Sequence, residues 1–261
     1  MVFTFTISPS AQTATVGIYF SGYTLTFTGS GVITYFITPS LPSGLSINSA
    51  TGLTTGTPTT TTTLTTYTIT GSDGVNTVSQ PYALTVQSYP CFKEGSKILT
   101  DKGYIPIQDL RKEYLVKTLK HGFLPIESIG KRELQHTCCK ERIKAQLYQC
   151  SNDAYPEVFE PLILTGCHSI LVDDFTSDKQ REQTFQLLGD IYITDNKYRL
   201  PACADHRASV YEKPGTYTIY HLALENDDYY MNYGIYANGL LVETCSKRYI
   251  KELSGMELIE E

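Results

Sequence analysis

Cys91 is a residue whose type and place in the chain could do chemistry on the chain itself. Cys91 lies in SYPCFKEGSKILT, residues 88–100, directly after Pro90. A thiol at that place can attack the carbonyl of Pro90, which moves the acyl group from the nitrogen of Cys91 to its sulfur and forms a thioester. The leaving group is the amino nitrogen of Cys91, so an acid must stand near it. An imidazole suits that task because it titrates near neutrality.

The junction at Cys91 coincides with a change in composition. All 21 Lys and Arg residues, and every acidic residue except Asp73, follow Ser88. The seven cysteines also lie in the second part. We therefore expect two domains, 1–88 and 91–261, with the candidate nucleophile as the first residue of the second.

Charge and hydropathy exclude several classes of protein. The net charge of −6 is modest and gives no reason to expect a nucleic-acid partner. No stretch reaches the roughly 18 apolar residues of a membrane span, and the start has no basic flank typical of a signal peptide. The cysteines are odd in number and irregularly spaced, which favours free thiols in a reducing compartment over a disulfide framework. The compartment itself stays open, with the cytoplasm and a virus particle as the candidates.

The first domain is predicted to be an all-β sandwich. Apolar or aromatic residues alternate with Thr or Ser in five runs, VFTFTIS, YTLTFTGS, VITYFIT, YTITGSDG and YALTVQS. This period of two is typical of half-buried strands. Clusters of Gly, Pro, Ser and Asn separate the runs about every ten residues, as in a small sandwich.

One segment of this domain, residues 39–59, is more specific. It reads PSLPSGLSINSATGLTTGTPT and resembles the signature LPxGLxxxxxTGxxxGTP of Ig-like, cadherin-like modules of cell-surface proteins. The resemblance implies two strands with their turns, and a binding or spacer module whose ligand is a protein or a glycan. Asp73 is its only carboxylate, so no calcium site is expected there.

The second domain is also predicted to be mostly β. Short apolar runs bounded by turns follow one another from KILTD to YGIYANGLLVE. Helix is expected in two places, at residues 176–190 and 246–261. The fold class is therefore all-β in both parts.

Three blocks of the second domain occur in a particular order. They are CFKEGSKILTDKGYIPIQDL, LILTGCHSILV and YHLALENDDYYMNYGIYANGLLVET. Together they resemble the hedgehog/intein, or Hint, family of self-processing domains, and the third block is most similar to the non-splicing branch of that family. The resemblance covers about 155 residues and implies a Hint β-fold preceded by the Ig-like sandwich.

The family's site residues can be transferred where the motifs match. The resemblance implies that Cys91 is the nucleophile and that His168 of the Thr-x-x-His motif protonates the leaving nitrogen. Thr165 would hold the imidazole or contact the scissile amide. A positioned acid of this kind is worth about 10²–10⁴ in rate. No cofactor is implied.

The sequence departs from the family where splicing requires particular residues. Inteins end in His-Asn, and cyclisation of that Asn releases the second fragment. Here Glu243 and Thr244 occupy those positions, with Cys245 next, and Thr cannot form a succinimide. The sequence therefore predicts N-terminal cleavage without splicing.

Other departures affect the surroundings of the site. Asp228, or its neighbour Asp227, stands where inteins often have a His, and we include Asp228 among the candidate catalytic residues. Gly130 is the nearest match to the sterol-activating aspartate of hedgehog domains, which argues against cholesterol transfer. Glu113 replaces a usual Gly before the second strand. The ring of Pro90 fixes φ and crowds the attack path.

Each residue also has a purely structural interpretation. Cys91 could be a buried small hydrophobe, and His168 could be a core histidine. Cys167 lies between Thr165 and His168, and we expect its side chain to face away from them, into the core. The set His136, Cys138, Cys139 and Cys150 could suggest zinc, but adjacent cysteines point to opposite faces of a strand. ENDDYY, residues 225–230, is more simply a solvated turn than a calcium site.

Two functions from different classes remain open. The first is autoprocessing through a thioester at Pro90–Cys91, resolved by a nucleophile or protein partner that the sequence does not name. The second is a structural or adhesion protein, of a virus particle or cell surface, with an inactive Hint fold.

Overall fold

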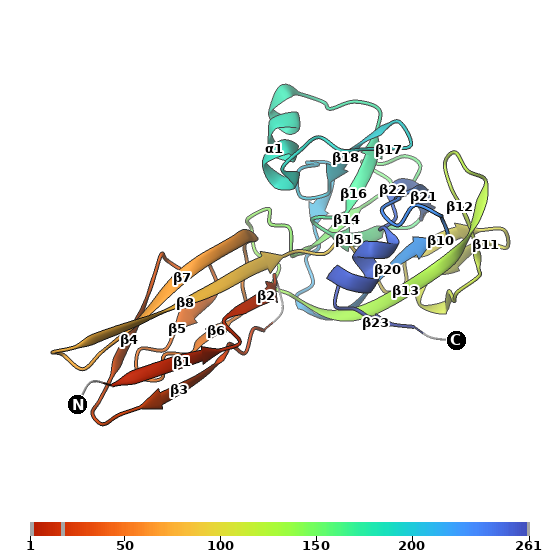
Figure 1. The fold of residues 1–261 in the computed structure, drawn as a ribbon. Coiled ribbons are helices and arrows are strands. Elements are labelled where there is room, and N and C mark those ends of the chain that lie inside the picture. The colour runs from red at the N-terminus through yellow and green to blue at the C-terminus, as the bar shows by residue number, and fades with distance from the viewer. Residues whose placement is uncertain (1–2, 17–18, 260–261) are drawn as a thin grey trace. The chain divides into compact units, whose positions relative to one another are not determined.

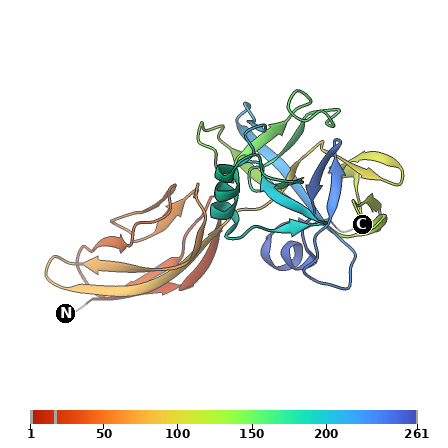
Figure 2. The same cartoon turned by 90° about the horizontal axis from the view of Figure 1, so that it is seen from above.

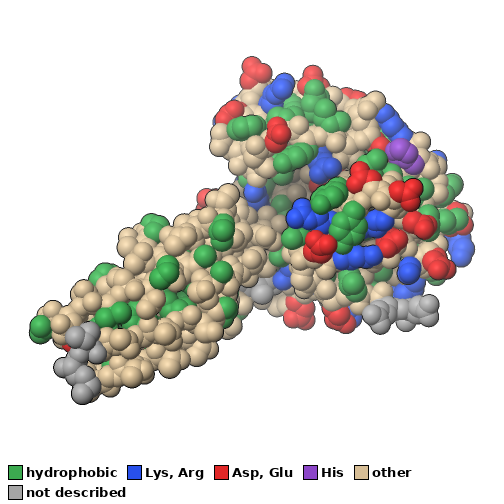
Figure 3. All heavy atoms as spheres, in the orientation of Figure 1, with side chains coloured by type: hydrophobic (Ala, Val, Ile, Leu, Met, Phe, Trp, Pro, Cys, Tyr) green, Lys and Arg blue, Asp and Glu red, His purple; other side chains and the backbone are tan. Residues whose placement is uncertain are grey.

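The computed structural model describes residues 3–16 and 19–259, and the chain divides into two compact units (Figure 1). The first unit comprises Met1–Ser88 and the second Tyr89–Glu261. Strands account for 46% of the structure and helices for 8%, so the predicted all-β class is confirmed. On the face drawn in Figure 3, the charged side chains gather on the second unit, as the composition requires.

The described residues of the first unit form eight strands in one larger and two smaller sheets. The larger sheet has the order β2-β8-β7-β4, and the smaller ones pair β1 with β3 and β5 with β6. Their bounds are β1 Thr4–Ser8, β2 Ala11–Thr15, β3 Thr24–Thr28, β4 Thr34–Thr38, β5 Leu45–Ile47, β6 Thr54–Gly56, β7 Thr62–Ser72 and β8 Thr77–Gln87.

Alternating side chains form the core of this unit. Phe5 of β1 is buried while its neighbours Thr4 and Thr6 are exposed, which is the period expected of a half-buried strand. The ring of Phe5 packs edge-on against Tyr35 of β4, with 5.5 Å between ring centroids, so the β1–β3 pair faces the larger sheet. The aromatic residues predicted to be half-buried thus join two sheets as in a sandwich.

The Ig-like signature forms the hairpin β5–β6, as its two-strand pattern predicts. Gly44 has a φ of +89°, and a Cβ there would stand 2.0 Å from the carbonyl oxygen of Thr57. Gly56 has a φ of +132°, and its Cβ would stand 2.2 Å from the carbonyl oxygen of Gly44. These two glycines are therefore required by the close approach of the two backbones.

Up to residue 259, the last one described, the second unit forms one continuous, strongly curved sheet of fifteen strands. Their order is β17-β18-β16-β22-β21-β10-β12-β13-β20-β9-β15-β14-β19, with β11 paired to β10 and β23 paired to β13. The bounds are β9 Phe92–Lys93, β10 Lys97–Thr100, β11 Gly103–Pro106, β12 Leu115–Lys117, β13 Phe123–His136, β14 Leu147–Cys150, β15 Leu162–Thr165, β16 Ser169–Val172, β17 Ile193–Thr194, β18 Lys197–Pro201, β19 Ser209–Val210, β20 Gly215–Leu224, β21 Gly234–Ala237, β22 Leu240–Glu243 and β23 Glu257–Leu258. The long strands β13 and β20 lie side by side through most of the unit (Figure 1).

The helix expected at 176–190 is α1, Asp178–Leu188, at the edge of the unit (Figure 2). Ser177 caps it by accepting a hydrogen bond from the amide of Gln180, and Gly189 ends it in the left-handed conformation. A 3₁₀ turn spans Ile107–Asp109. The C-terminal helix expected at 246–261 is much shorter: a single π-helical turn, Tyr249–Leu253, is followed by β23, and residues 260–261 lie outside the described residues. No helix among the described residues has the length and hydropathy needed to cross a membrane.

Candidate functional site

Cys91 immediately precedes β9, which lies between two neighbouring strands. The register pairs Phe92 with Leu164 of β15 on one side and with Tyr220 of β20 on the other. One residue further along these antiparallel ladders, Thr165 and His221 flank Cys91. The curved sheet therefore brings together residues that are more than seventy positions apart in the chain.

Thr165 holds the backbone on both sides of the Pro90–Cys91 peptide bond. Its hydroxyl accepts the amide hydrogen of Cys91 at 2.9 Å and donates to the carbonyl oxygen of Tyr89 at 2.9 Å. In the opposite sense, the amide of Thr165 donates to the carbonyl oxygen of Cys91 at 2.9 Å. The amide nitrogen that would leave during an acyl shift is thus fixed by the threonine of the Thr-x-x-His motif.

His168 follows in a turn that reverses the chain from β15 to β16. Its amide donates to the carbonyl oxygen of Thr165 at 2.9 Å, which closes the turn. Its Nε2 lies 3.2 Å from the carbonyl oxygen of Glu243, the last residue of β22. A carbonyl only accepts hydrogen bonds, so Nε2 carries the hydrogen and Nδ1 presents a lone pair.

Burial sets the protonation states of the nucleophile and the histidine. Both Cys91 and His168 are 0% exposed. Burial lowers the pKa of His168 to about 3, although the backbone groups of Glu243 and Cys91 act in the opposite direction. Burial also raises the pKa of the Cys91 thiol well above its usual value; nearby Cys167 raises it further, and the positive charge of Arg132 lowers it. At neutral pH the site holds a thiol and a neutral imidazole.

His221 is a site residue that the sequence analysis quoted within YHL but did not assign. Its ring lies 5.1 Å from that of His168 and 5.7 Å from that of Phe92, measured between centroids. Neither of its ring nitrogens has a hydrogen-bond partner among the described residues, and Nδ1 of His168 has none either. Burial, and then His168, lower the pKa of His221 well below its ordinary value. Such unpartnered buried nitrogens are uncommon and call for an explanation.

A further thiol and a phenol lie near Cys91. Cys245 is buried, its thiol donates to the carbonyl oxygen of Leu222 at 3.2 Å, and burial followed by the nearby Cys91 raises its pKa. The phenol of Tyr249 is buried without a hydrogen-bond partner among the described residues. Burial, with Cys91 as the next largest cause, raises the pKa of Tyr249.

The prediction that Cys167 faces away from the site is wrong. Its sulfur lies 3.6 Å from the hydroxyl of Thr165. The chain turns between Thr165 and His168, so the alternation of side chains along a strand does not apply there.

Asp228 does not join this cluster. It lies in the exposed turn between β20 and β21, where its carboxylate accepts the amide of Tyr230 at 2.8 Å. Its own amide donates to the side chain of Asn226 at 2.5 Å. These are the contacts of a solvated turn, so we do not include Asp228 in the site built from the structure.

The residues considered for zinc are used in other ways. Nδ1 of His136 accepts the amide of Leu147, and Nε2 lies 2.6 Å from the carbonyl oxygen of Tyr211, so neither nitrogen is open to a metal. Among the described residues, no group of three or more His, Cys, Asp or Glu side chains is arranged to hold a metal ion.

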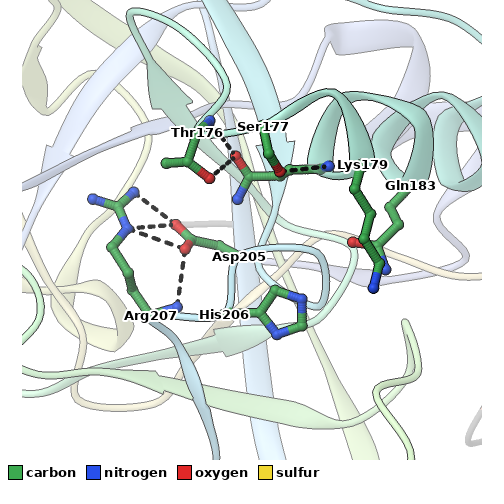
Figure 4. A pocket seen from close by; sticks show the side chains of 8 residues that line it. Thr176, Ser177, Lys179, Gln183, Asp205, His206 and Arg207 are labelled. Atoms are coloured by element: carbon green, nitrogen blue, oxygen red, sulfur yellow. Dashed lines mark hydrogen bonds and ion pairs between the residues drawn. The ribbon is translucent and has the colours of Figure 1, made fainter.

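A small hollow of about 120 Å³ lies beside the start of α1 (Figure 4). Two of its polar groups are already engaged: Ser177 caps the helix, and the buried carboxylate of Asp205 pairs with Arg207 at 2.7 Å. It contains no cysteine, and we find no arrangement there that could do chemistry.

Comparisons with known proteins agree with both predicted resemblances. A family model described as "Hint domain" matches residues 90–248, and one described as "Putative Ig domain" matches residues 2–87. Among curated proteins, no sequence matches this chain.

Solved structures with a similar fold include two from the intein group. The bacterial intein-like domain from Clostridium thermocellum is 14% identical, with 59% of this chain and 97% of that one covered and a TM-score of 0.33. The gp41-1 intein is 12% identical, with coverages of 59% and 98% and a TM-score of 0.32.

A third match covers a smaller share of the chain. A protein described as a putative alpha-galactosidase from Bacteroides fragilis NCTC 9343 is 20% identical over 32% of this chain, with a TM-score of 0.28. The chain spans only 17% of that protein's length.

Proposed function

The chain belongs to the Hint domain family, and from that premise we propose that it cleaves itself at Pro90–Cys91 through a thioester, without splicing. The observation that carries this proposal is the hydroxyl of Thr165, which binds the amide of Cys91 and the carbonyl of Tyr89. Holding both sides of one peptide bond is what an acyl shift at that bond requires.

The reaction exchanges one bond for another. The sulfur of Cys91 attacks the carbonyl carbon of Pro90, the carbon–nitrogen bond breaks, and the acyl group ends on sulfur. The thiol loses its proton and the leaving nitrogen gains one, so no external oxidant or reductant takes part. Water or another nucleophile then attacks the thioester, releases the segment that ends at Pro90, and returns the proton to the sulfur of Cys91.

His168 is the group that moves the proton. Because its Nε2 donates to Glu243, its Nδ1 lone pair is available to accept the proton of the Cys91 thiol and to deliver it to the nitrogen of Cys91. His221, on the other flank of Cys91, is the second candidate for this transfer.

The resting protonation states imply a slow reaction. A thiol with a raised pKa beside an imidazole with a pKa of about 3 disfavours the thiolate–imidazolium pair. The unmodified chain is therefore expected to persist as an intact precursor until a conformational change, or a strong external nucleophile, draws the equilibrium forward.

The end of the domain supports the absence of splicing. Thr244 occupies the position of the cyclising Asn, and its hydroxyl accepts the amide of Tyr233 at 2.9 Å. A hydroxyl cannot form the succinimide that releases the second fragment. Cys245 is near Cys91, but without that release step an acyl group placed on it would still leave the chain in one piece.

We propose that the processing domain runs from Cys91 to Glu261 and that the module 1–88 is the cargo it releases. The cargo is a binding or spacer module with a single carboxylate, Asp73. Its ligand, protein or glycan, is the partner through which the released segment would act.

A second candidate is a structural protein with an inactive Hint fold. The complete burial of Cys91 and His168 favours it, because burial disfavours the thiolate–imidazolium pair that the proton transfer would form.

The intact mass of the protein incubated with dithiothreitol or hydroxylamine distinguishes the two. Self-processing gives two fragments that part between Pro90 and Cys91, and Cys91→Ala abolishes them. Cys139→Ser, at a partly exposed thiol outside the cluster, is the matched control and should cleave normally. Cleavage that persists in Cys91→Ala would indicate a contaminating protease and remove the proposal.

A further inference from the structure

Arg132 of β13 lies beside the acyl side of the Pro90–Cys91 junction. Its guanidinium carbon is 4.7 Å from the centre of the Tyr89 ring, two residues before Cys91. Its Nη1 donates to the carbonyl oxygen of Ser254 at 2.9 Å. A stacking contact and a hydrogen bond therefore hold the guanidinium in one place next to the residue that precedes Pro90.

The Nε–H group of Arg132 is buried and has no hydrogen-bond partner among the described residues. No carboxylate of the described residues lies within ion-pair distance of this side chain either. A buried donor without an acceptor is unfavourable and calls for an explanation. The positive charge of Arg132 acts on Cys91: burial raises the pKa of the Cys91 thiol, and Arg132 lowers it by a smaller amount.

We propose that Arg132 stabilises the oxyanion that forms on the carbonyl oxygen of Pro90 when Cys91 attacks. This inference rests on the self-cleavage proposed above. As the sulfur–carbon bond forms, the electron pair of the carbonyl moves onto its oxygen, and Nε–H donates a hydrogen bond to the negative charge. The pair returns when the carbon–nitrogen bond breaks, and Arg132 neither gains nor loses a proton.

The unpaired state of Nε–H is what such a role requires. A preorganised donor is aimed at the place where the oxyanion will be, not at the oxygen of the resting carbonyl, so it remains without a partner until the reaction begins. In this scheme His168 and Thr165 act on the leaving nitrogen of Cys91, whereas Arg132 stabilises the charge on the carbonyl oxygen of Pro90. The atoms on both sides of the scissile bond thus each have a side chain that acts on them.

A hollow of about 410 Å³ reaches Arg132 from the surface. Lys131, Arg132, Glu133, Thr218, Gly255 and Glu257 line it. Lys131 is compensated by Glu257, with 3.4 Å between the charged atoms, so Arg132 is the uncompensated cation of this hollow among the described residues. A small cation could therefore enter and replace the guanidinium if the side chain were removed.

Chemical rescue tests the proposal. Arg132→Ala and Arg132→Lys are compared with Arg181→Ala, which removes an exposed arginine of α1 and is the matched control. Hydroxylamine-induced cleavage is followed by intact mass, with and without guanidinium chloride at concentrations far below those that unfold proteins. The thermal unfolding midpoint of each variant is measured in parallel.

We expect Arg132→Ala to cleave about 10²–10³-fold more slowly than Arg181→Ala, and guanidinium to restore at least part of that rate. Arg132→Lys, which keeps the charge but changes its geometry, should fall between them and covers the case in which Arg132→Ala fails to fold. A rate within twofold of the control, or a loss that guanidinium leaves unchanged, overturns the inference while self-cleavage stands. If the unmutated chain and Pro90→Gly both stay intact, self-cleavage itself fails and the inference falls with it.

Discussion

The amide hydrogen of Cys91 is bound at 2.9 Å by the hydroxyl of Thr165, which donates in turn to the carbonyl oxygen of Tyr89. One side chain thus fixes the backbone on either side of Pro90. The hydroxyl has one hydrogen to donate and two lone pairs, and both contacts use it in a consistent way. Any change in the geometry of this threonine should therefore be transmitted directly to the scissile bond.

Thr165→Val removes the hydroxyl and keeps the shape of the side chain. It leaves the buried amide of Cys91 and carbonyl of Tyr89 without their partner, so the free energy of unfolding should fall by about 1–3 kcal/mol. Thiol-induced cleavage should slow by at least about tenfold, because the leaving nitrogen is no longer held. Denaturant titration and intact mass over time measure the two effects.

Thr165→Ser retains the hydroxyl and is the matched control. It should keep the cleavage rate within about threefold, since the same two hydrogen bonds remain available. Equal loss of cleavage in both variants would show that the packing of the methyl group, and not the hydroxyl, positions the junction.

The two buried histidines should make the stability depend on pH. His168 has a pKa of about 3 in the fold and about 6.5 when unfolded, and His221 is shifted in the same direction. Between these values the unfolded chain binds more protons, so the stabilisation is complete above pH 6.5 and is lost as the pH falls towards 3. From pH 7 to pH 5 the lowered pKa of His168 should cost about 2 kcal/mol of unfolding free energy, and the lowered pKa of His221 should add to that loss.

The measurement is denaturant unfolding at both pH values, in a Cys91→Ala background that prevents cleavage. His221→Gln should make the loss between pH 7 and pH 5 smaller than in its parent. His206→Gln, at an exposed histidine, should leave the loss unchanged. An identical pH dependence in His221→Gln and its parent would mean that His221 is solvated or charged in the native protein.

The sequence was sufficient for those features that depend on local pattern. Alternating Thr and aromatic residues predicted the strands of the first unit, and Ser177 with Gly189 delimits the helix expected near 176–190. The three blocks predicted the Hint fold because each one is a short motif that can be recognised by itself, and because they occur in the order found in that family. Strand alternation, helix caps and short motifs all depend on a few neighbouring residues.

What the sequence could not provide is register between distant strands. His221 becomes a flank of Cys91 only because β20 pairs with β9, and Arg132 reaches Tyr89 only because β13 extends beside β20. A register shift of one residue in β20 would turn His221 to the opposite face of the sheet, and the same shift in β13 would turn Arg132. Asp228 shows the converse error, since a motif position was transferred to a turn that lies outside the cluster.

Glu113 illustrates a departure that can be tested by stability alone. It replaces a usual glycine of the family and has a φ of +72°, a conformation that L-residues adopt at a cost. Its amide donates to the carbonyl oxygen of Ile126 at 2.9 Å, and a glycine would keep that bond. Glu113→Gly should therefore raise the free energy of unfolding by about 0.5–1 kcal/mol.

The control for this change is Lys112→Gly at the preceding position, which is not among the residues with positive φ. There glycine relieves nothing and adds freedom to the unfolded chain, so stability should fall by a similar amount. Chemical denaturation measures both variants. If the free energy of unfolding changes in the same direction in Glu113→Gly and Lys112→Gly, the backbone at Glu113 is not strained.

Pro90 offers the sharpest separation of a slow self-cleaving domain from an inactive one. Its ring fixes φ next to the carbonyl that Cys91 must attack, and Pro90 is only half-buried while Cys91 is completely buried. Pro90→Gly removes the ring, frees φ, and should accelerate thiol-induced cleavage by about tenfold or more. The double variant Pro90→Gly/His168→Ala should lose that gain, because the leaving nitrogen then has no proton carrier.

Incubating the unmutated chain and both variants with thiol for a day, and reading intact masses, gives the answer. Faster cleavage in Pro90→Gly that disappears in the double variant assigns the slow step to the proline and the proton transfer to His168. Equal acceleration in both variants would transfer that role to His221, which is the remaining buried imidazole beside Cys91. If all three chains stay intact, the burial of Cys91 and His168 is the mark of a retained scaffold, and the second unit serves as a structural domain.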